Sequence, residues 1–414
     1  MDILIFILYL ILFAWLLNKI PFVQKSGLSP IWVNGLFVLK VAAGMAYGFY
    51  YSRIPDFQNQ SDTWKFYFDS LPQTKLLIEN PLRFFTELVQ SAEGSSYGRF
   101  FATTNSFWTD VKHLLMVKLM SVFNLLSGSS YYTNVIYYSF ITIFGPIATF
   151  RILNELFPGR KIMLTISIFL FPSFLFWGSG IHKEGIIFLL LSVIFYVFYF
   201  GLKHKQKMLT YGLITLLCIL FIFFIRNYIA LALVPFLLCW WIAEKRMKNK
   251  WISFAWISLL GAGLFFGSKF IVPVIDAPAA VILRKQEFTA LGGQSLLPQR
   301  DLKPSFISFL KNAPQALNHS LVRPYITEIY SPFYFLCALE ILMIWILVFI
   351  WYFRYRENMF DKPVIITMFM FSMASLLLIG YIVPQLGAIV RYRSIFIPFI
   401  VAPIVATIRW RKSF

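Results

Sequence analysis

Long apolar runs separated by short polar breaks make up most of the chain. Because an α-helix needs about 20 apolar residues to cross the hydrocarbon layer of a membrane, each run of this length predicts one span. The pattern predicts eleven spans, at residues 2–18, 31–51, 132–150, 162–178, 185–201, 209–225, 227–243, 251–272, 332–353, 363–383 and 390–408. We therefore expect an all-α polytopic membrane protein in which residues 1–414 form a single membrane domain.

The composition supports this interpretation. Hydrophobic residues make up 59% of the chain and charged residues 13%, and so much apolar surface cannot be hidden inside one water-soluble globule. The formal net charge is +19, which in a soluble protein would indicate a nucleic-acid partner. Here the basic residues gather in alternate loops, near Lys203, Lys245 and Arg354 and in the C-terminal tail. The positive-inside rule explains this pattern, so we predict no nucleic-acid partner, an outside N-terminus and a cytoplasmic C-terminus.

Two long segments lie outside the membrane in this topology, residues 52–131 and residues 273–331. Within the first, residues 110–128 are almost apolar enough to form a further span, but basic side chains interrupt them, namely Lys112, His113 and Lys118. We predict that this stretch lies on the membrane surface as an interfacial helix, with a further span as the alternative. The second segment contains two adjacent glycines and several prolines, so we expect it to be partly irregular.

Charged side chains gather at the outer ends of the predicted spans. They are Asp62 in the first outer segment, Lys183 and Glu184 after the fourth span, Arg226 between two spans, and Arg391 and Arg393 at the start of the last. Charges at the hydrocarbon edge are costly, so they usually pair with each other, line a wet cavity or extend to the water. Each of these charges also has an ordinary explanation, such as anchoring a helix end. We expect His182, which precedes Lys183 and Glu184, to be dispensable. Their common placement predicts a functional site.

Two further charges lie inside predicted spans, Lys40 in the second and Glu340 in the ninth. Facing lipid, each would cost about 3 kcal/mol, so both should face the interior of the helix bundle. We predict that Lys40 and Glu340 pair with each other, with a proton relay as the alternative.

The order of these features resembles the GT-C superfamily of integral-membrane glycosyltransferases, in particular its mannosyl- and aminoarabinosyl-transferase-like branch. The residues that carry the resemblance are Ser61-Asp62-Thr63-Trp64-Lys65, Phe157-Pro158-Gly159-Arg160-Lys161, Lys183-Glu184, and Arg391-Tyr392-Arg393-Ser394 with Pro398. The match covers about residues 30–200 and the last span. The chain departs from the family pattern at both acidic motifs: the usual pair of acids in the first is reduced to Asp62 followed by Thr63, and the second has Glu184 in place of the more frequent Asp. It also has an additional first span and no soluble C-terminal domain.

The resemblance implies transfer of a sugar from a polyprenyl-phosphate carrier to a glycan, lipid or protein acceptor. It places the reaction on the outer face of a bacterial inner membrane. Asp62 is then the candidate base for the acceptor hydroxyl, a role typically worth about 10²- to 10⁴-fold in rate. Arg391, Arg393 and Tyr392 are candidate contacts for the leaving phosphate, with Arg226 or Lys183 as a second contact. Glu184 would position the acceptor or, with Asp62, hold a divalent cation such as Mg²⁺ or Mn²⁺.

Two other functions fit the same residues. A surface-polysaccharide polymerase or ligase also acts on polyprenyl-linked glycans. In such an enzyme the arginines and residues 273–331 would be the main functional elements, and Asp62 would be dispensable. A transporter or flippase of an anionic lipid or solute would use Lys40, Glu340 and the arginines to line a path. The sequence shows no internal repeat, which weakens a transporter built from two inverted halves.

Overall fold

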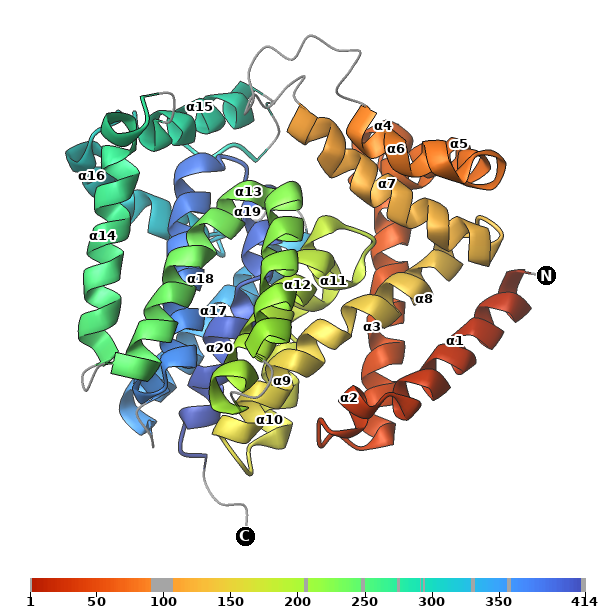
Figure 1. Ribbon diagram of the computed structural model, residues 1–414, viewed down its shortest axis with the longest axis horizontal. Helices are drawn as coiled ribbons and strands as arrows, with labels where there is room; N and C mark the ends of the chain where they lie inside the picture. Colours follow the sequence, from red (N-terminus) through yellow and green to blue (C-terminus); the bar gives the residue numbers. More distant parts are fainter. Residues whose placement is uncertain are drawn as a thin grey trace. The chain divides into compact units, whose positions relative to one another are not determined.

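The computed structural model describes residues 2–90, 107–204, 208–246, 250–273, 276–290, 292, 295–328, 332–355 and 359–410. Within these ranges the chain is almost entirely helical and contains no β-strand (Figure 1), which confirms the all-α prediction. The chain divides into two compact units. Unit 1 comprises Met1–Ile152, Phe174–Val197 and Leu209–Asn227, and unit 2 comprises Leu153–Ser173, Phe198–Met208 and Tyr228–Phe414.

The helices of unit 1 follow the first third of the chain and then two later segments. They are α1 (Asp2–Lys19), α2 (Pro21–Gln24), α3 (Pro30–Ser52), α4 (Phe57–Gln60), α5 (Asp62–Glu79), α6 (Pro81–Gln90), α7 (Phe107–Ser127), α8 (Tyr131–Thr142), most of α9 (Phe144–Leu156), most of α11 (Pro172–Ser179), whose first two residues belong to unit 2, and most of α12 (Lys183–His204). The first part of α13 (Met208–Arg246) also belongs to this unit.

Unit 2 holds the rest of α13 and most of the C-terminal half. Its helices are α10 (Lys161–Phe169), α14 (Lys250–Ile271), α15 (Ala277–Ala290), α16 (Phe306–Leu317), η1 (Asn318–Val322), α17 (Pro332–Arg354), η2 (Met359–Asp361), α18 (Pro363–Ile382), α19 (Leu386–Ser394) and α20 (Ile397–Thr407). Helix α20 packs against α10, α17 and α18, so the last helix of the chain lies in the core of this unit.

Seven described helices are long and apolar enough to cross a membrane, and the number rises to nine if each of two bent pairs counts as one span. The bent pairs are α10 with α11, at 56°, and α19 with α20, at 58°. Proline explains each break, because Pro172 and Pro398 lie in the first turn of the second helix and lack the N–H that would continue the first. Several apolar helices of this length confirm the membrane interpretation.

The predicted count of eleven spans is not confirmed, for two reasons. The predicted spans at 209–225 and 227–243 are two helical stretches within α13, separated at Arg226, which leaves helical geometry at φ −149° and ψ 87°, and they count as one candidate, Met208–Glu244. The apolar part of α1, Ile3–Lys19, is shorter than the other candidates. Hydropathy located the apolar runs correctly, and helical geometry is broken at Arg226 between two of them.

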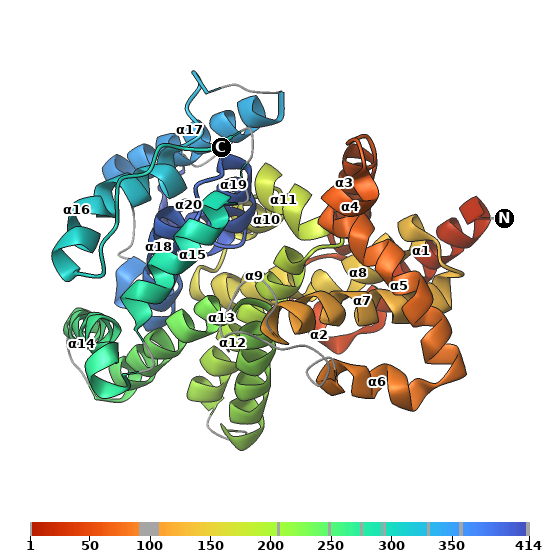
Figure 2. The same cartoon turned by 90° about the horizontal axis from the view of Figure 1, so that it is seen from above.

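The described part of the first predicted outer segment contains the helices α4, α5, α6 and α7. Helices α5 and α7 lie side by side (Figure 2) and make the most extensive helix contact in the described chain. Polar side chains join them, since Asn124 Nδ2 donates to Ser70 Oγ at 2.7 Å and to Thr74 Oγ1 at 3.2 Å. Helix α7, which covers most of residues 110–128, is not among the candidate spans. Residues 91–106 of this segment lie outside the described ranges.

The second predicted outer segment is partly irregular, as expected: residues 295–305 and 323–328 lie outside any helix. It contains α15, α16 and η1, and α16 packs on α18. Tyr381 Oη on α18 donates to the carbonyl of Phe309 on α16 at 2.6 Å. Residues 274–275, 291, 293–294 and 329–331, including the second of the two adjacent glycines, lie outside the described ranges.

Candidate functional site

The start of α5 is held in place by aromatic and polar contacts within unit 1. Trp64 stacks on Tyr131 with ring centroids 4.0 Å apart, and its Nε1 donates to the carbonyl of Gly48 at 3.0 Å. The hydroxyls of Thr63 and Tyr131 are hydrogen-bonded at 2.7 Å. Because these residues follow Asp62 directly, the first residue of α5 has a fixed position between the end of α3 and the start of α8.

The turn between α11 and α12 packs closely against α3. A side chain at Gly180 would collide with the ring of Tyr47, and a Cβ at Gly44 would lie 2.6 Å from the carbonyl oxygen of Ser179. Lys40 is buried beside this turn, where its Nζ donates to the carbonyl of Gly178 at 2.7 Å. The ammonium therefore satisfies a carbonyl at the C-terminal end of α11, where the helix dipole favours a cation.

His182 lies at the centre of a row of ionisable side chains. Its Nε2 is 2.8 Å from Asp62 Oδ2, and its Nδ1 is hydrogen-bonded to the carboxylate of Glu184. The backbone carbonyl of His182 accepts a hydrogen bond from Tyr138 Oη. The imidazole therefore links two carboxylates, one on each ring nitrogen.

Glu184 connects this row to a buried arginine. Its side chain is 1% exposed, lies in the first turn of α12, and accepts a hydrogen bond from Arg226 Nη2. The N-terminal end of a helix stabilises a carboxylate, and the guanidinium compensates its charge. The helical break of α13 occurs at Arg226 itself. A buried acid and a buried base thus meet where two apolar runs are interrupted.

The four side chains form a continuous relay from Arg226 through Glu184 and His182 to Asp62. Only the last is open to solvent: the Asp62 side chain is 51% exposed, whereas His182 and Glu184 are 1% exposed. The structure therefore brings together three of the predicted site residues, Asp62, Glu184 and Arg226. The relay presents one exposed carboxylate whose orientation is fixed by buried partners.

His182 corrects the interpretation of the sequence, in which it was the dispensable neighbour. It is the residue through which Asp62 and Glu184 are joined. Its contact with Asp62 spans 120 positions along the chain, so no local pattern marked it. The one available signal was its place two residues before Glu184 in a polar break.

A second carboxylate–imidazole pair lies on the same face of α5, two helical turns further on. Asp69 Oδ2 is 2.7 Å from His113 Nε2, and their side chains are 43% and 32% exposed. The ring of Phe66 lies between the pairs, 5.3 Å from that of His113 and 6.2 Å from that of His182. The ammonium of Lys183 lies 5.4 Å from the Phe66 ring. Sequence reasoning did not identify Asp69 and His113 as a pair.

The pKa of His113 lies below its usual value. Partial burial is the largest cause, the charges of Lys183 and Lys65 lower it further, and Asp69 acts in the opposite direction. His113 is therefore neutral at pH 7. The proximity of Asp69 to Nε2 places the single ring proton on that nitrogen.

The two predicted arginines of α19 have different surroundings within unit 2. Arg393 is buried, and its Nη1 donates to the carbonyls of Ser320 at 3.1 Å and Arg323 at 2.7 Å. Arg391 is only partly buried and donates from Nη2 to Tyr392 Oη at 3.1 Å. Residues two apart on a helix point about 200° from each other, so Arg393 anchors the chain around η1 and Arg391 is the more accessible of the two.

Lys40 and Glu340 each have neutral hydrogen-bond partners in their own unit, which corrects the predicted pairing. Glu340, in unit 2, accepts from Ser173 N and from Ser173 Oγ, both at 2.6 Å. Ser173 lies in the first turn of α11, where free backbone N–H groups favour a carboxylate. Helix ends therefore satisfy both charges.

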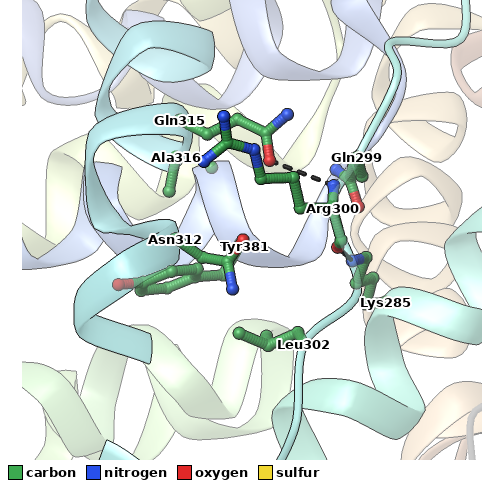
Figure 3. Close-up of a pocket in the computed structure, with 9 residues that line it drawn as sticks. Lys285, Gln299, Arg300, Leu302, Asn312, Gln315, Ala316 and Tyr381 are labelled. Carbon is green, nitrogen blue, oxygen red and sulfur yellow. Dashed lines mark hydrogen bonds between the residues drawn. The ribbon is translucent and has the colours of Figure 1, made fainter. Parts of the chain in front are cut away.

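A small polar pocket in unit 2 contains none of the predicted site residues (Figure 3). Its volume is about 10 Å³, enough for about one water molecule and far below the roughly 300–1,000 Å³ of typical ligand pockets. Lys285 Nζ donates to the carbonyl of Arg300 at 2.6 Å, and Gln315 Oε1 accepts from Arg300 N at 3.1 Å. These polar groups hold the loop before α16 in place.

The geometry does not favour the divalent cation that was one of the two alternatives for Glu184. Among the described residues there is no group of three or more His, Cys, Asp or Glu side chains placed to hold a metal ion. Asp62 and Glu184 contact opposite nitrogens of His182, so the imidazole separates the two carboxylates that were expected to share the ion.

Comparison with known proteins gives no relative for this chain: no family model matches it, and no match is found among curated proteins or solved structures.

Proposed function

We propose that this protein is a membrane glycosyltransferase of the GT-C type, which transfers a sugar from a polyprenyl-phosphate carrier to an acceptor hydroxyl. The observation that carries the proposal is the exposed Asp62 carboxylate, which His182 holds at 2.8 Å and which the buried Glu184 and Arg226 support from behind. An exposed carboxylate in a fixed orientation can accept a proton from a substrate hydroxyl.

In the proposed reaction the acceptor oxygen attacks the anomeric carbon of the carried sugar. The bond from that carbon to the phosphate oxygen breaks, and its electron pair leaves with the phosphate. The hydroxyl proton passes to Asp62. His182 and Glu184 are positioning residues, because they act on the acceptor only through Asp62.

Arg391 is the proposed contact for the leaving phosphate. The phosphate gains negative charge as it departs, and a guanidinium that binds it more strongly at that stage lowers the barrier. Its partial exposure and its hydrogen bond to Tyr392 support this role. Arg393 contributes indirectly by fixing the backbone around η1.

We further propose that the carboxylates face the outside of a bacterial inner membrane, with the N-terminus outside and the C-terminus in the cytoplasm. In this arrangement α13 crosses twice, because the break at Arg226 divides it into two segments that are each about long enough for one span. A single-cysteine variant at position 183 should react with an impermeant thiol reagent added outside the cell. Labelling from the cytoplasmic side alone would overturn this orientation.

The test of function is a transfer assay with protein reconstituted in lipid, a radiolabelled polyprenyl-phosphate sugar and a membrane extract as acceptor. We expect Asp62→Asn to slow transfer by about 10²- to 10⁴-fold and Arg391→Ala to slow it as well. The control is Asp56→Asn. Asp56 is an exposed acid that precedes α4, and its backbone φ of 48° is a conformation that asparagine also adopts.

Three outcomes of this assay differ in meaning. If folded Asp62→Asn and Arg391→Ala variants keep the rate of the wild-type protein, the proposed site is wrong. Transfer of a whole glycan that does not depend on Asp62 would favour the polymerase or ligase. If the Asp62→Asn protein in liposomes moves an anionic lipid and transfers no sugar, the transporter is favoured.

A further inference from the structure

The second carboxylate–imidazole pair has no part in the proton transfer described above. We propose that Asp69 and His113, with Lys65 and Lys183 beside them, bind a second sugar unit of a carbohydrate acceptor, next to the unit whose hydroxyl reacts at Asp62. This inference rests on the proposed function, and it narrows the acceptor to a glycan of at least two sugar units.

The spacing of the two pairs sets the length of the ligand. Asp62 and Asp69 are seven residues apart on α5 and therefore about 10 Å apart along one face of the helix. One sugar ring is too short to contact both carboxylates, whereas two linked rings span this distance. The Phe66 side chain between them is buried, so it lies beneath the surface that separates the Asp62 and Asp69 carboxylates.

The charges of this row favour a neutral ligand. Two aspartates and two lysines face it, Asp62, Asp69, Lys65 and Lys183, and their formal charges cancel. The charged groups that act on His113 are Asp69, Lys183 and Lys65. A polyanion or a polycation would gain little here. A ligand with many hydroxyls could donate to the carboxylates and accept from the ammonium groups.

The state of His113 adds a directed contact. With its ring proton on Nε2, where Asp69 lies 2.7 Å away, Nδ1 is a hydrogen-bond acceptor for a hydroxyl. Among the described residues no hydrogen bond to this Nδ1 is seen. Among the residues whose side chains are described, no buried acid or arginine contacts His113 as Glu184 contacts His182. The pair therefore suits binding rather than catalysis.

The test measures binding of defined sugars by saturation-transfer NMR on the whole protein in lipid nanodiscs. The probes are maltose, cellobiose, mannobiose and chitobiose, each compared with its monosaccharide. We expect at least one disaccharide to bind more tightly than its monosaccharide, and Asp69→Asn and His113→Gln to weaken that disaccharide by about 10- to 100-fold. Binding of the monosaccharide should not change, and Asp56→Asn should behave as wild type.

The proposal is overturned if no disaccharide binds more tightly than its monosaccharide, or if the two variants leave the preference intact. A parallel transfer assay separates this inference from the proposed function. If Asp69→Asn raises the KM for the acceptor and keeps kcat, both stand. If transfer proceeds with an unchanged KM, the second sugar site is wrong and the function stands. If disaccharide binding depends on Asp69 but no transfer occurs, the function is wrong.

Discussion

The two carboxylate–imidazole pairs along α5 have nearly the same chemistry. They differ in the other side chains that surround each imidazole. Asp62–His182 and Asp69–His113 have oxygen–nitrogen distances of 2.8 and 2.7 Å. Behind His182 lie Glu184 and Arg226, both buried, whereas His113 is 32% exposed and has lysines as its charged neighbours apart from Asp69. A supported pair is fixed in orientation, and an exposed pair can adjust to its ligand.

This difference indicates how one helix can carry two roles. Residues seven apart on α5 share a face, so the helix presents two aspartates at a set distance. The partner helices then decide the function of each aspartate. The turn before α12 supplies a buried relay to Asp62, and α7 supplies a single imidazole to Asp69.

The largest expected effect comes from breaking the support of the first pair. Glu184→Gln removes the charge that compensates Arg226 and leaves a buried guanidinium, so we expect the free energy of unfolding to fall by about 3–5 kcal/mol. The measurement is denaturant unfolding of the purified protein in detergent, followed by tryptophan fluorescence. The matched control is Glu79→Gln, an exposed acid at the end of α5, for which we expect a change within about 0.5 kcal/mol.

A double-mutant cycle sharpens the same comparison. Replacing both charges, as in Glu184→Gln with Arg226→Met, should cost less than the sum of the two single substitutions, because neither charge is left buried alone. Additive losses would show that Glu184 and Arg226 do not depend on each other, and the relay would then end at Glu184.

The side chain between the pairs should have a smaller effect. Phe66→Leu keeps an apolar residue of similar size, so we expect a loss of about 1 kcal/mol in unfolding free energy. Because Phe66 contacts both rings, the substitution should loosen both pairs. NMR of labelled histidine in wild-type and variant protein would detect this. A change confined to one imidazole would contradict the placement of Phe66 between them.

The smallest expected effect is a pH dependence of the exposed pair. Burial holds the pKa of His113 below its usual value near 6.5, so the unfolded chain binds more protons than the folded one as the pH falls below that value. His113 should therefore lower stability as the pH drops from about 6.5. Unfolding midpoints between pH 7.5 and 5.5 should fall less steeply in His113→Gln than in wild type, and equal slopes would refute the shift.

Hydropathy was enough to predict the all-α fold and most apolar helices, because the need to bury about 20 apolar residues acts locally. It also placed the break in α13, where Arg226 leaves helical geometry between two predicted spans. Lys40 and Glu340 were expected to pair, but helix ends provided partners that the sequence does not mark.

The candidate site was predicted in part. Asp62, Glu184 and Arg226 were expected on one side, and the structure brings them into one relay. His182 was undervalued, and Asp69–His113 was not seen as a pair, because their contacts join positions 120 and 44 residues apart. Arg391 and Arg393 were assigned one role, and the phase of the helix gives them two environments.

The most direct test of the account compares the two aspartates in the chemical step alone. Single-turnover transfer would be measured with the radiolabelled polyprenyl-phosphate sugar bound in advance and the acceptor at saturating concentration. We expect Asp62→Asn to slow this step by about 10²- to 10⁴-fold, while Asp69→Asn leaves it close to the wild-type rate. Equal rates for both variants, or a larger loss in Asp69→Asn, would contradict the assignment of Asp62 as the base.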